Sequence, residues 1–224
     1  MEKIKLVEQH VYKPSSADYA ELDRVCFLSK NLYNATLYVA RQGLFNTGKF
    51  IRYNQINKEF THSSQPDYCA LPRKVSKMTQ MQVDQSITSY LGLLSLYKKG
   101  ELENRPGLPG YLKKDGRQVV TYSRQAISLV RKGFVRLSGT SVFIPTNQEN
   151  ISFVRVVPSR TNKNITVEVG YELPVPPVVH GTTAAGDLGM NNLLSVIFPD
   201  RSPIIFNGKP LKSVNIITTS DLPN

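Results

Sequence analysis

The amino-acid sequence predicts an α+β protein in which a discontinuous antiparallel β-barrel is interrupted by a helical insert and followed by a second group of strands. Three observations predict it: a strand-like segment opens the chain, helical periodicity fills the next hundred residues, and short alternating segments follow. The 224 residues suffice for one or two domains with cores of their own. We predict a barrel from residues 1–14 and 105–178, a helical insert at 15–104 and a C-terminal fragment at 179–224.

The first predicted strand covers residues 4–12, which are rich in β-branched and apolar side chains and are followed by Lys13-Pro14. The strand-like segments that could pair with it lie beyond residue 105. We therefore expect this strand to join them across the helical insert.

Three helices are predicted next. The first has Asp18 as a capping residue, Glu21 three positions later, and Gly43 as its C-terminal stop. A short helix is expected around residues 53–60, and a longer one begins after Leu71-Pro72.

From residue 105 onward, turn residues separate short β-type segments. The run Pro106-Gly107-Leu108-Pro109-Gly110 opens this part, and the stiff Pro174-Val175-Pro176-Pro177 closes it. The predicted strands are 118–122, 134–137, 142–144, 151–157 and 165–171.

The charge of the chain favours a polyanionic partner. Its 28 Lys and Arg residues against 17 Asp and Glu give a formal net charge of +11, so nucleic acid is the first candidate through counterion release. The alternative is a basic domain whose charge only keeps it soluble. Without a membrane-length apolar run or a signal-peptide pattern, we expect no membrane partner and a cytoplasmic, nucleoid-associated location.

Neither cysteine pattern nor histidine pattern predicts a metal site. Cys26 and Cys69 are isolated, no C-x-x-C pair exists, and we interpret both as buried thiols and expect no zinc. His10, His62 and His180 are scattered without ligand spacing.

Basic residues concentrate near the junction between helices and strands, where they could contact phosphates. Tyr97, Tyr111 and Tyr122 are interleaved with them and could stack on bases. The alternative is a solvated basic face over packed tyrosines. The candidate cations are Arg105, Lys113, Lys114, Arg117, Arg124, Arg131 and Lys132.

A second basic cluster, Arg73, Lys74 and Lys77, opens the longer helix, where the helix dipole disfavours cations. A bound anion would offset that, and simple solvent exposure explains it equally well. Tyr53 is a weaker candidate for the same surface, for which we favour core packing.

A carboxylate at the end of a small-residue strand marks the C-terminal fragment. Asp187 is followed by a glycine turn and an apolar strand, as at the start of an RNase H-like (RuvC-type) nuclease. Such enzymes place two metal ions about 4 Å apart between several carboxylates. The only acidic residues after Asp187 in this sequence are Asp200 and Asp221. The alternative interpretation of Asp187 is an aspartate that stabilises a turn, which is the commoner role of an Asp-x-Gly sequence. The predicted strands here are 182–185, 193–198 and 203–206.

Several motifs, in order along the chain, resemble the insertion-sequence-encoded TnpB (OrfB) proteins. They are Cys26-Phe27-Leu28-Ser29-Lys30-Asn31-Leu32-Tyr33-Asn34-Ala35, Leu71-Pro72-Arg73-Lys74-Val75, Arg105-Pro106-Gly107-Leu108-Pro109-Gly110-Tyr111 with Asp115-Gly116-Arg117, Asp187-Leu188-Gly189-Met190-Asn191-Asn192-Leu193, and Asn207-Gly208-Lys209-Pro210-Leu211-Lys212-Ser213.

The resemblance implies a lineage of RNA-guided DNA endonucleases, long classified as transposases and related to type V CRISPR nucleases. It implies a wedge-like β-barrel with a helical recognition insert that binds guide RNA and target DNA, and a RuvC-like domain that cuts with Mg²⁺. By position, Asp187 is the first metal-binding acid. The later catalytic acids and the zinc ribbon have no counterpart, so we expect a C-terminally truncated copy with no functional cofactor that does not cleave DNA alone. The alternative is a cleavage-incompetent RNA- and DNA-binding regulator that occludes target sites.

Overall fold

The computed structural model describes residues 3–131, 133–175, 183–189 and 192–208. The chain divides into two compact units, Met1–Val175 and Pro176–Asn224, called here the first and the second unit. Each is considered by itself.

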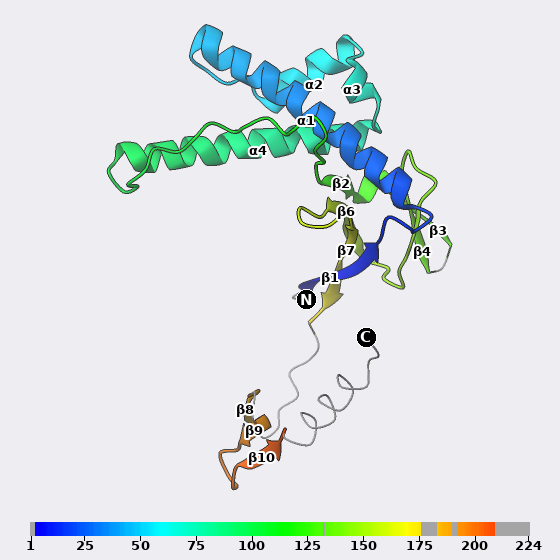
Figure 1. Cartoon of the computed structure of the whole chain (residues 1–224), viewed down its shortest axis with the longest axis vertical. Helices are drawn as coiled ribbons and strands as arrows, with labels where there is room; N and C mark the ends of the chain where they lie inside the picture. The colour runs from blue at the N-terminus through cyan, green and yellow to red at the C-terminus, as the bar shows by residue number, and fades with distance from the viewer. Residues whose placement is uncertain (1–2, 132, 176–182, 190–191, 209–224) are drawn as a thin grey trace, which may run out of the picture. The chain divides into compact units, whose positions relative to one another are not determined.

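The helical part of the first unit consists of two long helices and two short ones (Figure 1). The long helices, α1 and α4, pack against each other, and α2 and α3 contact both of them. No helix in the described part of the chain is long and apolar enough to cross a membrane. The bounds are α1 Tyr19–Thr47, α2 Tyr53–His62, α3 Pro66–Cys69 and α4 Arg73–Lys98.

The strands of the first unit form two antiparallel sheets. The larger has the order β1-β7-β6-β2, with β1 at Lys3–Tyr12, β7 at Ile165–Pro174, β6 at Ile151–Pro158 and β2 at Val120–Ser123. The predicted pairing of the first strand across the helical insert is confirmed, because β1 and β7 pair along their whole lengths.

The smaller sheet has the order β3-β4-β5 and contains Ile127–Arg131, Phe134–Leu137 and Phe143–Pro145. The short 3-10 helix η1, Arg124–Ala126, leads from the larger sheet into it. Pairing among the described strands gives two open sheets, neither closed into a ring. The barrel therefore remains a prediction, whereas the antiparallel β-structure is confirmed.

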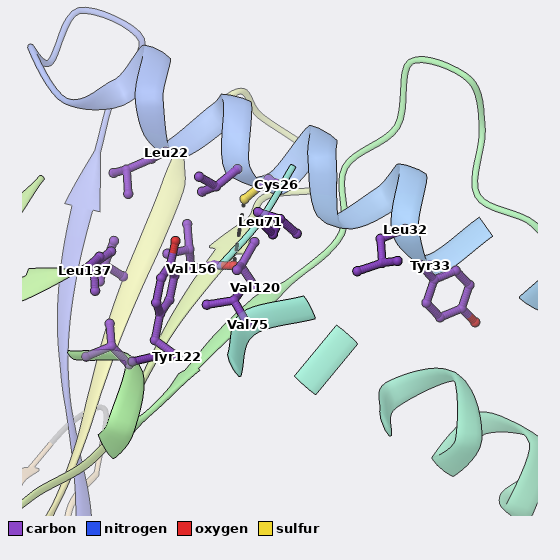
Figure 2. Packing of buried hydrophobic residues seen from close by; sticks show 14 of the residues in the cluster. Leu22, Cys26, Leu32, Tyr33, Leu71, Val75, Val120, Tyr122, Leu137 and Val156 are labelled. Carbon is purple, nitrogen blue, oxygen red and sulfur yellow. Dashed lines mark hydrogen bonds between the residues drawn. The ribbon is translucent and has the colours of Figure 1, made fainter. Parts of the chain in front are cut away.

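The core lies where α1 and α4 meet the larger sheet. Figure 2 shows Leu22 and Cys26 of α1 pointing towards Val120 and Tyr122 of β2 and Val156 of β6. All five are fully buried. Apolar side chains from both long helices thus cover one face of the sheet.

The predicted helix stop at Gly43 is wrong. α1 continues to Thr47 and ends at Gly48, whose φ of 73° is left-handed and whose N–H donates to the Leu44 carbonyl. Gly43 is instead a site of close packing, since a Cβ there would lie 2.4 Å from Cγ1 of Ile51. The glycine marks a tertiary contact rather than a helix end.

The prediction that Asp18 and Glu21 cap the start of α1 with their side chains is also wrong. Asp18 is the N-cap residue, but its side chain makes no capping hydrogen bond. The Glu21 carboxylate accepts hydrogen bonds from the Ser141 hydroxyl and backbone N–H instead, which lowers the pKa of Glu21. A tertiary partner therefore takes the place of the local one.

Other boundaries shift by a few residues. The strand expected at 118–122 begins at Val120, because the Gln118 N–H donates to the Cys26 carbonyl of α1.

The prediction of two buried thiols is half wrong: Cys26 is buried and Cys69 is exposed.

The second unit contains an antiparallel sheet of order β10-β9-β8, formed by Ile204–Asn207, Asn192–Ile197 and Ala185–Asp187. The strand expected at 182–185 is shifted, because β8 begins only at Ala185 and ends at Asp187; residue 182 lies outside the described residues. The apolar side chains of Ile197, Ile204 and Ile205 are 62%, 42% and 61% exposed. The described part of this unit thus buries little of its apolar surface.

Candidate nucleic-acid interface

Residues 111–118, called here the clamped loop, are fixed along one face of α1 by hydrogen bonds. The Asn34 amide donates to the Leu112 carbonyl and accepts from its N–H, both at 2.9 Å. One turn earlier in the helix, the Lys30 ammonium donates to the Lys114 carbonyl at 2.7 Å. Side chains four positions apart lie on the same face of a helix, so α1 holds the backbone of this loop at regular intervals.

The other end of the clamped loop is fixed by an ion pair. Arg117 donates from Nε and Nη2 to the two oxygens of Asp23, both at 2.7 Å. Its remaining nitrogen donates to the carbonyls of Asp115 and Gly116. The hydrogen bond with Asp23 raises the pKa of Arg117. Arg117, predicted to bind phosphate, is therefore already paired with a carboxylate inside the unit.

Lys30 is a buried cation that the sequence did not single out. It is 4% exposed, and its Nζ lies 4.0 Å from the centroid of the Phe27 ring. Burial lowers its pKa, and the nearby Arg117 lowers it further. A carbonyl and an aromatic face thus replace the water that would otherwise solvate the ammonium. The available signal was the spacing of Lys30 and Asn34, four residues apart, next to the buried positions of the helix.

The outward side of this region carries four exposed cations, which we call the loop surface. They are Lys113 and Lys114 of the clamped loop, and Arg160 and Lys163 of the turn between β6 and β7. Two hollows adjoin three of them: one of about 370 Å³ has Lys163 in its wall, and one of about 580 Å³ has Lys113 and Arg160. Both hollows also have Asp115 and Arg117 in their walls. The sequence analysis predicted Lys113 and Lys114 as phosphate contacts. It did not predict that Arg160 and Lys163 lie on the same surface.

A second hollow surface, called here the α4 groove, lies between α4 and the larger sheet. It measures about 510 Å³. Gln82 is held in its wall by a hydrogen bond to the Thr121 hydroxyl at 3.3 Å and by one from the Gln118 amide at 3.0 Å. The lining residues are Met78, Met81, Gln82, Gln85, Val119, Thr121, Ser123, Ser152, Phe153 and Arg155.

The predicted cations at the start of α4 lie just before the groove-lining residues of this helix in the sequence. Arg73, Lys74 and Lys77 are all exposed. Lys74 and Lys77 each precede a methionine of the groove by four residues, so they lie on the same side of α4 as its lining. The amide and hydroxyl groups in the wall of the α4 groove thus lie near the exposed ammonium groups of Lys74 and Lys77.

The prediction that Tyr122 stacks on a base is wrong. Its side chain is 0% exposed in the core, where burial raises its pKa. Tyr53 is half-buried at the first position of α2, and its N–H donates to the Asp84 carboxylate at 3.2 Å. Among the other interleaved tyrosines, Tyr97 and Tyr111 are exposed.

The remaining candidate cations are spread over the first unit. Arg105 and Arg124 are exposed, Arg131 is the last residue of β3, and Lys132 lies outside the described residues. The structure thus brings together only part of the predicted set.

Asp187 is exposed at the end of β8, where it pairs with Ser195 of β9. In residues 3–131, 133–175, 183–189 and 192–208, no three His, Cys, Asp or Glu side chains come close enough together to hold a metal ion. Asp221 lies outside these ranges. The donor set described does not fit a two-ion centre, and no metal-dependent step can be derived from it.

Comparison with known proteins gives distant structural likeness only. No protein-family model and no curated protein matches the chain. The chain is similar to a protein chain in the cryo-EM structure of the Cas12f1-sgRNA-target DNA complex, with a TM-score of 0.37 and 14% sequence identity. The match covers 96% of this chain and 60% of that one, so this chain spans less than two thirds of its length. The likeness is too distant to assign a function.

Proposed function

We propose that this chain is a nucleic-acid-binding protein of the RNA-guided nuclease lineage, whose first unit binds guide RNA and target DNA. One observation carries the proposal: the loop that is fixed to α1 presents Lys113 beside Arg160 of the turn between β6 and β7, in the wall of one hollow. The motifs that resemble the TnpB proteins support the lineage, and the net charge of +11 supports a polyanionic partner.

The arrangement favours phosphate binding over a merely solvated basic face. The backbone of the clamped loop is held by Asn34 and Lys30, while Lys113 and Lys114 remain exposed. A fixed backbone reduces the conformational entropy that is lost when a ligand binds. Solubility alone would not require cations from residues 113–114 and 160–163 to converge on one surface.

The α4 groove supports a second contact of a different kind. Its amide and hydroxyl groups are the kinds of group that bind base edges, and the neighbouring Lys74 and Lys77 can bind phosphates. We assign target DNA to this groove and RNA to the loop surface.

The test compares two triple variants of equal charge. In the first, Lys113, Lys114 and Lys163 are changed to Gln; in the control, Lys5, Lys49 and Lys58, which are also exposed, are changed to Gln. Fluorescence anisotropy measures the affinity for labelled RNA between about 50 and 200 mM salt. Arg117 is left intact because its ion pair stabilises the loop.

The first variant should bind more weakly and show a flatter dependence of log affinity on log salt, by about 0.7 per lost contact to a single strand. The control should retain the slope of the wild-type protein. Equal slopes in both variants would show that the loop surface makes no specific phosphate contact.

A second candidate function is a regulator that binds and occludes target sites without cutting. The position of Asp187 favours it, since no metal-binding group of three acids, histidines or cysteines lies around it in the described residues.

A further inference from the structure

Tyr111, at the beginning of the clamped loop, and Arg41 and Phe45 of α1 form a small cluster, called here the aromatic cradle. The guanidinium carbon of Arg41 lies 5.0 Å from the ring centroid of Tyr111 and 5.7 Å from that of Phe45. The two rings are 48% and 61% exposed. Both distances are within the range of cation–π contact.

The cradle continues the face of α1 that holds the loop. Tyr111 precedes Leu112, whose backbone is fixed by Asn34 through two hydrogen bonds. Arg41 and Phe45 follow Asn34 by seven and eleven positions, a spacing that returns to the same side of a helix. The rings therefore lie beside the loop that carries Lys113 and Lys114.

The charge of Arg41 is not balanced within the described chain. No carboxylate in this part of the protein pairs with it, and its Nε is buried without a hydrogen-bond partner. Two partly exposed aromatic rings beside a guanidinium that no carboxylate of the described residues pairs with suit a ligand that has both a flat π surface and a negative charge. A nucleotide has both.

We propose that the aromatic cradle stacks an unpaired base of single-stranded nucleic acid, while the adjoining phosphates lie along Lys113 and Lys114. This inference rests on the proposed function, which it makes more specific. Stacking on Tyr or Phe needs a base that is not in a duplex, and it tolerates any base because each has a π face. The cradle thus contributes a preference for single strands that the cations alone cannot provide.

The experiment uses the full chain and three labelled probes: a single-stranded RNA, the same strand with abasic sites, and its duplex. Abasic sites keep the phosphates and remove the stacking surface. The variants are Tyr111→Ala, Tyr111→Phe and Phe45→Leu, and the control is Phe143→Ala, an exposed aromatic residue of β5 that belongs neither to α1 nor to the clamped loop. Thermal unfolding followed by circular dichroism checks that each variant is folded.

Tyr111→Ala should weaken binding of the intact single strand about tenfold, equivalent to about 1.4 kcal/mol, with an unchanged salt slope. It should have no effect on the abasic strand or the duplex. Tyr111→Phe and Phe143→Ala should bind like wild type, and Phe45→Leu should weaken binding of the single strand only.

If wild-type protein binds intact and abasic strands equally, or if Tyr111→Ala binds like wild type, the cradle does not stack a base. The proposed function would then still stand on the loop-surface variants. If wild-type protein binds none of the three probes, both proposals fail together.

Discussion

Arg117 and Asp23 lie 94 residues apart and are joined by two parallel hydrogen bonds of 2.7 Å. This ion pair ties the end of the clamped loop to the second turn of α1. The side chains are 31% and 28% exposed, so solvent screens part of the interaction. We infer that Arg117 stabilises the clamped loop through this ion pair.

The variant Arg117→Lys should therefore affect stability more than binding. A lysine cannot form the paired hydrogen bonds of a guanidinium, and the loss should be about 1 kcal/mol, or a melting temperature lower by about 2–4 °C. The melting curve and the salt slope of RNA binding check this. An unchanged melting temperature with a flatter slope would mean that Arg117 contacts phosphate.

Two glycines within helices should respond oppositely to alanine. Gly43→Ala places a Cβ 2.4 Å from Cγ1 of Ile51 and 3.0 Å from its backbone N, so we expect a loss of about 1–3 kcal/mol. Gly92→Ala meets no atom within 4 Å and should stabilise α4 by about 0.5–1 kcal/mol. Urea unfolding measures both, and a stabilising Gly43→Ala would contradict the packing described.

The two cysteines should differ in reactivity. Burial raises the pKa of the Cys26 thiol to about 12, and its Sγ contacts the Val156 carbonyl at 3.9 Å. Cys69 is exposed. Iodoacetamide at pH 8, followed by mass spectrometry, should modify Cys69 and leave Cys26 unmodified until the protein is unfolded. Modification of both at equal rates in the folded protein would contradict this result.

The variant Asp187→Ala should bind nucleic acid with unchanged affinity. We expect neither the wild-type chain nor the variant to cleave DNA. A single carboxylate binds hydrated Mg²⁺ only weakly, and no metal-binding group surrounds Asp187 in the described residues. The assay combines plasmid DNA, Mg²⁺ and a candidate guide RNA. Cutting by the wild-type chain that is lost in the variant would show that other acids complete the site.

The sequence predicted those elements whose signals are local. The strand Phe134–Leu137 was predicted with its observed bounds, and the helix after Leu71-Pro72 begins where expected. Gly43 shows the limit, because a glycine near the end of a helical pattern has the same local signal whether it ends the helix or admits Ile51. Only the tertiary contact decides.

The candidate site shows the same limit. Lys113 and Lys114 were predicted because their charge is visible in the sequence, whereas Lys30 and Asn34 act on residues 84 and 78 positions away. Tyr122 was assigned to the surface because cations surround it in sequence, yet the register of β2 directs its ring into the core. Pairings at such distances leave no local pattern.

The pairing of β1 with β7 also sets an order of events during synthesis. Lys3 donates to Glu172, which is 169 residues away. At a typical elongation rate of 5–20 residues per second, the N-terminal strand waits roughly ten to thirty seconds for its partner. Four of its apolar residues, Ile4, Leu6, Val7 and Val11, stay partly exposed even after pairing. Until residues 165–174 have been synthesised, β1 lacks its pairing partner, so the larger sheet cannot be completed before that point.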